Sequence, residues 1–442
     1  MIGDILLPAF LPHKISQERI VVQPIKDLIS GVQILFVAFG AMVLVPLLTG
    51  LNPSMALLGA GIGTLLFQLI TKRKVPIFLG SSFAFIAPII FSLQTWGMGA
   101  TMFGLFAAGF MYFVFALIIR WRGIGLVNTL IPAVVIGPVI MVIGLSVAVT
   151  ATQMAMGISG GTAIMNDTLA ISLSIATFAA TVIITIFGKG LFRLIPILGG
   201  IFVGYVLALI ADLTGLSASL NNGQEILNLN NLINAAWFAV PEFHKPEVNW
   251  LAALFMLPVA IAPAIEHIGG IMAISKVTGK DFTKDPGLDK TLAGDGLGVC
   301  VAGLIGGPPV TTYGEVTGAV MITKNDNPKI MTYAAIFAIA MAFMGKFNAF
   351  LNSIPLPVMG GIMILLFGTI ASIGLKTLID AKVDIMIPRN LVIISATLIT
   401  GVGGYTINIG NFPFAGVGLA AVLAIVLNLI LPEPKNQENE AS

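Results

Sequence analysis

The sequence predicts an all-α polytopic membrane protein: fourteen spans in two inverted seven-span repeats, with short extended segments in spans 3 and 10. Three observations predict this class. The 442 residues are 57% hydrophobic and only 10% charged, whereas a soluble domain is about 25% charged. Apolar stretches of about 20 residues, the length a spanning helix needs, recur along the chain. Similar motifs also occur in the same order in its two halves.

Each predicted span is an apolar stretch between polar, charged or Gly/Pro-containing connections. The spans are expected near residues 29–50, 53–71, 76–92, 97–119, 127–150, 168–187, 194–213, 250–274, 291–305, 308–322, 330–349, 355–373, 390–405 and 413–431. The predicted domains are a first repeat at 29–215 and a second at 250–431, with an N-terminal segment 1–28, a linker 216–249 and a tail 432–442.

The positions of Lys and Arg predict the orientation, because short cytoplasmic loops are enriched in them. With both termini inside, every Lys and Arg except Lys245 and Lys346 falls in an inner segment. We therefore expect cytoplasmic termini and an external linker. A net charge of +2 says nothing about nucleic acid, and we expect no nucleic-acid partner. The single Cys300 excludes a disulfide framework or a cysteine metal cluster.

Two motif pairs predict the internal repeat. IPAVVIG at 131–137 recurs as IPLPVMG at 354–360, and GAGIG at 59–63 recurs as GDGLG at 294–298. If each half has an odd number of spans, the second half enters the membrane inverted. Such repeats place the substrate near the midplane, where broken helices meet.

Two segments, GSSFAFIAP at 80–88 and GGPPVTTYGEVTG at 306–318, predict those breaks. Proline blocks the preceding helical turn, and β-branched residues favour extended backbone. We expect each segment to be a short extended stretch followed by a half-helix, lining a cavity with free N–H groups. The alternative is an ordinary span with a proline kink.

Glu266 and Glu315 are the main candidate site residues, since each lies within an apolar stretch. Intramembrane acids are costly and usually mark a substrate or ion path. Removal from water favours the neutral form of a carboxyl group, so two acids beside one cavity suit a neutral ligand with N–H donors and coupling to a proton. The alternative is structural: a Glu266–His267 pair that fixes helix packing, or a packing role for Glu315.

Four further residues are candidates for the pocket or the proton path. Phe83 is suited to stacking on a flat ring, although ordinary packing explains it equally well. Tyr313 offers a hydroxyl. His267 projects from a helix in another direction than Glu266, which favours a core histidine. Asp295 either supports a broken segment or joins the proton path.

These motifs resemble the uracil permeases of the nucleobase–ascorbate transporter family, also called nucleobase–cation symporter-2. The resemblance covers nearly the whole chain and rests on QILFVAFGAMVLVPLLTGLNP, VPIFLGSSFAFIAP, IEHIGG, DPGL, TTYGE and IPLPVMGG. It implies a core domain of spans 1–4 and 8–11, a gate domain of spans 5–7 and 12–14, and a homodimer. It also implies proton-coupled uracil import by alternating access across a bacterial inner membrane.

The resemblance also implies the roles of four positions. The side chains of Glu266 and Glu315 hold the pyrimidine, and Phe83 and Gly314 contribute backbone groups. The acid at Glu315 favours a pyrimidine over a purine.

The chain departs from the family pattern at several positions. Gly270 stands where uracil permeases have histidine, and Ile34, beside the candidate Gln33, replaces a first-span histidine. Val310 and Val316 replace asparagines around TTYGE. Gly270 puts a histidine-assisted proton relay in doubt and leaves the two glutamates in place.

Three other functions remain to be weighed. A purine permease for xanthine or urate would keep the fold. An intramembrane metalloprotease would show a zinc-binding HExxH motif, and the sequence has none; its three histidines, His13, His244 and His267, are scattered. A channel or anion exchanger would place a cation at the site. We expect no enzyme activity and no cofactor, with the proton as coupling ion and the lipid bilayer as surroundings.

Overall fold

The computed structural model describes residues 13–432, apart from 124, 126–128, 190–194, 222, 228 and 410–411. The predicted C-terminal tail lies almost wholly outside the described residues.

The chain is mainly helical, with three short strand pairs. Its first half contains α1 (His13–Thr49), α2 (Pro53–Ile70), β1 (Leu79–Ser81), η1 (Phe83–Phe85), α3 (Ile86–Arg122), α5 (Ala133–Leu145), α6 (Ala148–Ala155), β2 (Ile158–Ser159), β3 (Thr162–Ala163), α7 (Asp167–Phe187) and α8 (Pro196–Leu213). The linker carries α9 (Leu216–Leu220) and α10 (Leu229–Asn234).

The second half repeats this general order of helices. It contains α11 (Trp250–Val259), α12 (Ile261–Thr278), η3 (Thr283–Gly287), α13 (Leu288–Ile305), β4 (Val310–Thr312), α14 (Gly314–Thr323), α15 (Lys329–Ala342), α16 (Gly345–Asn352), α17 (Leu356–Asp380), α18 (Pro388–Val402), β5 (Thr406–Ile409), β6 (Phe412–Ala415) and α19 (Gly416–Ile430).

Long apolar helices confirm the membrane class predicted from composition. Among the described residues, eight helices are long and apolar enough to cross a membrane, or nine if the sharply bent pair α15 and α16 counts as one span. The helix α1 extends N-terminally beyond the predicted first span, whose apolar part is Lys26–Thr49. Gly97, at φ +81°, interrupts α3 where the sequence separates spans 3 and 4.

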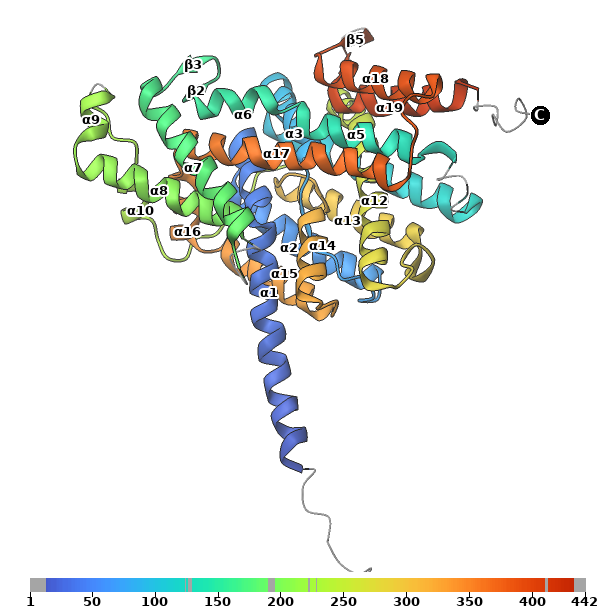
Figure 1. Cartoon of the computed structure of the whole chain (residues 1–442), viewed down its shortest axis with the longest axis horizontal. Coiled ribbons are helices and arrows are strands. Elements are labelled where there is room, and N and C mark those ends of the chain that lie inside the picture. Colours follow the sequence, from blue (N-terminus) through green and yellow to red (C-terminus); the bar gives the residue numbers. More distant parts are fainter. Residues whose placement is uncertain are drawn as a thin grey trace, which may run out of the picture.

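The helices pack in two groups. In the first group, α13 packs on α2 and α3, α11 packs on α3, and α15 packs on α1 and α2. In the second, α17 packs on α5, α6, α7 and α8, and α18 packs on α5 and α19. Figure 1 shows α5, α17, α18 and α19 along the top of the molecule, above α2, α14 and α15. The site described below lies where the two groups meet.

Glycines bring α2 and α13 into close contact in the first group. A Cβ atom on Gly63 would lie 3.3 Å from the Cα atom of Gly298. On either side of this point, a Cβ on Gly59 would lie 3.1 Å from the Cβ of Ala302, and a Cβ on Gly294 would lie 3.0 Å from the ring of Phe67. Side chains at these glycines would force the two helices apart.

Glycines also allow close contacts between helices of the second group. A Cβ on Gly144 would lie 2.5 Å from the carbonyl oxygen of Phe367, where α5 crosses α17. A Cβ on Gly137 would lie 2.6 Å from Leu378, and a Cβ on Gly360 would lie 2.1 Å from the backbone nitrogen of Ala155. The long helix α17 therefore packs along both α5 and α6.

Loops that the sequence predicts for the inner side contact one another. Ion pairs join Lys74 to Asp285, Lys280 to Asp326 at 2.7 Å, and Lys276 to Asp380 at 4.0 Å. They connect the segment after α2 with the loop between α12 and α13, that loop with the segment after α14, and the end of α12 with the end of α17.

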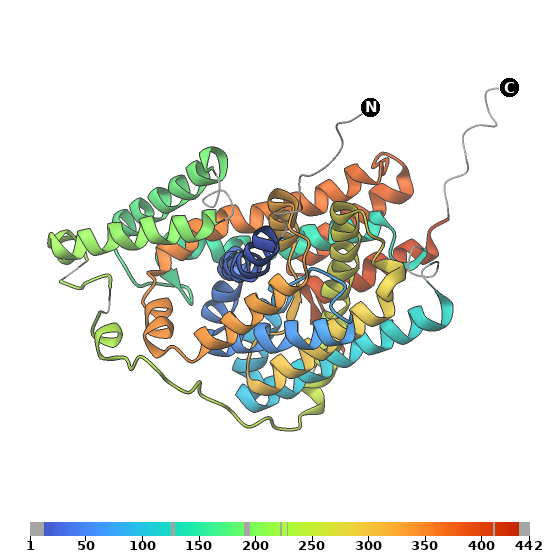
Figure 2. The ribbon, with the colours of Figure 1, turned by 90° about the horizontal axis from the view of Figure 1, so that it is seen from below.

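Segments predicted for the outer side also meet. The backbone N–H of Glu247 donates to Gly99 at 3.0 Å, and that of Ala239 donates to Phe343 at 2.9 Å. The ammonium of Lys346 donates to the carbonyl of Ile233 at 2.9 Å. Figure 2 shows the chain between α10 and α11 running along one edge of the bundle. The linker therefore covers the ends of the helices on this side.

Candidate functional site

The predicted extended segments form an antiparallel strand pair in the interior. In the register of β1 and β4, Leu79 pairs with Thr312, Gly80 with Thr311, and Ser81 with Val310. All six residues are buried. The Ser82 N–H donates to the carbonyl of Pro309 at 2.8 Å. Pairing satisfies backbone groups that a single extended segment would leave unbonded inside a membrane protein.

Tyr313 fixes the strand pair from the β4 side. Its hydroxyl donates to the carbonyl of Ser81 at 2.8 Å. Its ring covers Gly80, where a Cβ atom would lie only 2.4 Å from two ring carbons. From the other side, the Leu79 N–H donates to the hydroxyl of Thr64 on α2 at 2.9 Å. Glycine at position 80 is therefore required by the tyrosine that follows β4.

Each strand leads into a helix. The 3₁₀ turn η1 begins at Phe83 and continues into α3, and α14 begins at Gly314. The first N–H groups of a helix have no partner within it, and its N-terminus carries partial positive charge. Glu315 lies in the first turn of α14, and Gly314 is exposed. The start of α14 therefore offers donors and a carboxylate side by side.

The structure brings Glu266 and Glu315 together from different helices. Glu266, on α12, lies within electrostatic range of both Glu315 and Asp295. Tyr313 interacts with both glutamates. Both glutamate side chains are half-buried. The approach of α12 to β4 depends on Gly270, where a Cβ atom would lie 2.8 Å from the Thr312 hydroxyl.

A cavity of about 180 Å³ adjoins Glu315. Its walls come from α1, α8 and α14, and include Phe36, Val37, Ile197 and Ile322. A cavity of about 150 Å³ admits benzene, so this one has room for a single planar six-membered ring. It lies at the junction of the two helix groups, since α8 belongs to the second.

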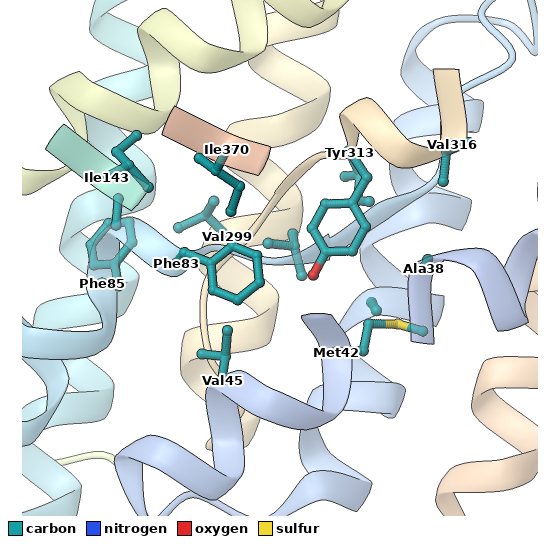
Figure 3. Close-up of a cluster of buried hydrophobic side chains, with 14 of the residues drawn as sticks. Ala38, Met42, Val45, Phe83, Phe85, Ile143, Val299, Tyr313, Val316 and Ile370 are labelled. Atoms are coloured by element: carbon teal, nitrogen blue, oxygen red, sulfur yellow. The ribbon is translucent and has the colours of Figure 1, made fainter. Parts of the chain in front are cut away.

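Phe83 packs in the apolar wall beside the strand pair. It is 8% exposed, and its ring meets that of Phe367 edge to face, with centroids 5.3 Å apart and planes at 89°. Figure 3 shows Phe83 and Tyr313 in one cluster with Val45 and Ile370. The Phe83 ring thus joins the first helix group to α17, and its backbone stands at the start of η1.

His267 and Asp295 form a separate buried pair. The Nδ1 atom of His267 lies 3.0 Å from an oxygen of Asp295, and both side chains are fully buried. The edge of the imidazole also meets the ring of Phe67. The imidazole of His267 therefore faces α13. The pair connects α12 to α13.

Gln33 lies at another cavity, near the junction of α1, α14 and α15. This cavity measures only about 10 Å³ and is shared with Ser30, Thr323 and Asn325. It is about the size of one water molecule. Val37 and Ala319 line both this space and the larger cavity at Glu315. Gln33 is therefore near the site without facing the same space.

Sequence reasoning missed three polar groups at the strand pair. The hydroxyls of Ser81, Ser82 and Thr312 are buried and have no hydrogen-bond partner within the described part of the chain. Buried hydroxyls normally have partners, so these groups are available to a ligand or water. The sequence signal for these hydroxyls was a pair of hydroxyl residues near a glycine in each broken segment, Ser81-Ser82 and Thr311-Thr312.

Solved structures of membrane transporters share this fold. The murine Solute Carrier 26 family member A9 anion transporter aligns with a TM-score of 0.63 at 11% identity, over 92% of this chain and 68% of that one. The transmembrane domain of the cyanobacterial bicarbonate transporter BicA aligns with a TM-score of 0.62 at 14% identity, over 95% and 98% of the two chains. At these identities the likeness concerns the fold alone.

Sequence comparison gives the family. The chain belongs to the permease family: residues 25–410 match the group described as "Permease family". A probable uracil permease of Pasteurella multocida is 53% identical over 93% of this chain and 95% of its own length. The uracil permease of Bacillus caldolyticus is 46% identical over 92% and 93%, and that of Escherichia coli K12 is 38% identical over 90% of each.

Proposed function

We propose that this chain is a proton-coupled symporter that imports uracil by alternating access. The observation that carries the proposal is that Glu315, which borders a ring-sized cavity at the start of α14, lies within electrostatic range of Glu266 on α12. Relatives named uracil permease, which are 38–53% identical over at least 90% of the chain, support the ligand.

The chemistry of the site suits a planar imide. Uracil has two ring N–H donors and two carbonyl acceptors. The carboxylates of Glu266 and Glu315 accept from N–H groups, and hydrogen bonds to a charged group are the stronger kind. The N–H groups at the starts of η1 and α14, at Phe83 and Gly314, face the carbonyls as donors. Either carboxyl can take up the coupling proton, in which case it donates a hydrogen bond instead.

The packing of glycines supports two inverted repeats. If Gly59 corresponds to Gly294, then Phe67 corresponds to Ala302 and Gly63 to Gly298. A two-fold axis converts the contact of Gly59 with Ala302 into a contact of Gly294 with Phe67, and both contacts occur. The contact of Gly63 with Gly298 converts into itself. The axis thus passes between α2 and α13.

The second helix group obeys the same relation. Matching Gly137 to Gly360 makes Leu378 the counterpart of Ala155. The contact of Gly137 with Leu378 then becomes the contact of Gly360 with Ala155, which is also present. These pairings favour the fourteen-span arrangement, in which the first group is the core domain and the second is the gate domain.

Position and assembly complete the proposal. The protein would lie in a bacterial inner membrane with both termini cytoplasmic and function as a homodimer. The cavity at Glu315 includes Ile322 and Ile197, which lie close to the predicted inner loops. In the proposed orientation this cavity would lie on the cytoplasmic side of the site, on the path by which uracil would leave.

A purine permease for xanthine or urate is the alternative within the same fold. Because carboxylates accept hydrogen bonds, two acids favour a ligand that presents ring N–H donors to them, rather than ring nitrogens with lone pairs. Competition of labelled uracil uptake by thymine, xanthine and urate separates the alternatives. Stronger inhibition by xanthine or urate than by thymine would favour the purine carrier.

Uptake into proteoliposomes tests the mechanism. With an inward-directed proton gradient, we expect uracil to accumulate inside above its external concentration, and a protonophore to abolish the accumulation. Glu225→Gln, in the exposed linker, serves as a matched control that removes one acid outside the site. Uracil entry that only equilibrates, with or without the gradient, would contradict proton coupling.

A further inference from the structure

A second cavity, distinct from the site at Glu315, lies between the two helix groups. It measures about 140 Å³, and its lining has no polar surface. Phe115, Ile118 and Ile119 of α3 form one wall, Ala264 and Ile268 of α12 another. The opposite side comes from Leu130 and Ile131, which precede α5, and from Ile425 of α19. An apolar cavity of this size excludes water and accepts hydrocarbon.

A basic residue stands directly above this cavity on α3. Arg122 follows Phe115, Ile118 and Ile119 by seven, four and three residues, spacings that place all four on one helix face. At about 1.5 Å per residue, Arg122 lies roughly 10 Å along the axis from Phe115. Arg120 lies two residues earlier and faces another direction.

The end of α3 has the features of a membrane–water boundary. Trp121 is 75% exposed, and tryptophan is enriched at the level of the lipid headgroups. Arg120 and Arg122 are exposed, and neither guanidinium pairs with an acid within the described ranges. A cation at headgroup depth thus adjoins a hydrocarbon-lined space at acyl depth.

We propose that this crevice binds an anionic phospholipid, with an acyl chain in the cavity and its phosphate at Arg122. Arginine binds phosphate oxygens through paired N–H donors, and the distance from Arg122 to Phe115 is spanned by the upper part of an acyl chain. The lipid would touch α3 and α12 on one side, and the residues before α5 together with α19 on the other. Any effect of the lipid on transport rests on the proposed function, because the two helix groups would move past each other during transport. Binding of the lipid does not depend on that function.

Thermal unfolding of the full-length protein in detergent tests the headgroup contact. We expect phosphatidylglycerol to raise the Tm and phosphatidylcholine to raise it much less. Arg122→Gln should bind phosphatidylglycerol about fivefold more weakly, the effect of losing one basic residue near a membrane surface. Arg120→Gln is the matched control and should bind like the unchanged protein. Arg122→Lys should retain most of the shift.

Equal phosphatidylglycerol titrations for Arg122→Gln and Arg120→Gln would overturn the proposal. So would equal stabilisation of the unchanged protein by phosphatidylcholine and phosphatidylglycerol. Either result would show that no specific anionic headgroup site exists at Arg122.

Filling the cavity tests the acyl contact separately. Ala264→Leu inserts a side chain from α12, and Ile425→Phe inserts one from α19, so either variant serves if the other does not fold. We expect loss of the phosphatidylglycerol shift while the shift produced by uracil persists. A full lipid shift in a folded variant would overturn the proposal. If uracil fails to stabilise even the unchanged protein, the proposed function fails, and the lipid titrations still decide this inference.

Discussion

The imidazole of His267 lies 3.0 Å from the carboxylate of Asp295, and neither side chain is exposed. The pair connects α12, which carries Glu266, to α13, which carries the glycines that pack on α2. Because Glu266 and His267 are neighbours on α12, a shift of this helix would displace the glutamate, so the pair supports the site.

Removing one member of this pair should destabilise the protein strongly. His267→Leu leaves Asp295 buried without its partner, which typically costs about 3–5 kcal/mol. Replacing both residues by leucine removes the unpaired group and should recover a large part of the loss. Thermal unfolding in detergent measures both effects. A double variant no more stable than His267→Leu would show that the pair does not act as a unit.

The contact of Gly80 with Tyr313 gives a second prediction. Gly80→Ala would place a methyl group 2.4 Å from the tyrosine ring, and should abolish uracil uptake by displacing the start of α14. Tyr313→Phe removes only the hydrogen bond to Ser81, worth about 1 kcal/mol, and should reduce uptake mildly. Uptake in cells expressing each variant at equal levels distinguishes them. If Gly80→Ala transports normally, the tyrosine does not hold the strand pair in place.

The crossing of α2 and α13 at Gly298 gives a third prediction. Gly298→Ala would bring a Cβ to 2.9 Å from Val310 and 3.3 Å from Gly63. Such overpacking costs about 1–3 kcal/mol, so the Tm should fall. The matched control is Gly368→Ala on α17, where no atom lies within 4 Å; it should leave the Tm unchanged or slightly higher. Equal Tm changes would refute the close packing of α2 on α13.

Phe83 gives a prediction that distinguishes a side-chain contact with uracil from a backbone contact. Its ring packs on Phe367, and its proposed contact with uracil is through the backbone. Phe83→Leu should therefore lower the Tm while changing uracil affinity less than either glutamate substitution. Binding measured in the folded population separates these effects. An affinity loss as large as that of Glu315→Gln would instead indicate that the ring stacks on the base.

Local signals in the sequence were sufficient for several features. Proline pairs, glycines and β-branched residues predicted the extended segments, which form β1 and β4. The separation of the predicted spans 76–92 and 97–119 coincides with the interruption of α3 at Gly97. The charge asymmetry of the loops grouped segments that do contact one another. Each of these features depends on residues close together in the chain.

Other features depend on distant residues and could not be predicted in this way. The partner of His267 is Asp295 on another helix, and only packing selects it from several buried polar groups. The 83° bend between α15 and α16 and the β5–β6 strand pair, around the connection between the last two predicted spans, also have no clear periodic signal. Position 80 requires glycine because of the ring of Tyr313, which is far away in the sequence.

Equilibrium binding of uracil to the purified protein tests the central claim most directly. Hydrogen bonds to charged groups contribute about 1.5–3 kcal/mol, so Glu266→Gln and Glu315→Gln should each weaken binding by about tenfold or more. Glu225→Gln should leave it unchanged. Calorimetric titration measures the uracil affinity of each variant, and thermal unfolding checks that the variant is folded. Uracil affinity equal to that of the unchanged protein in either folded glutamate variant would contradict the two-glutamate site.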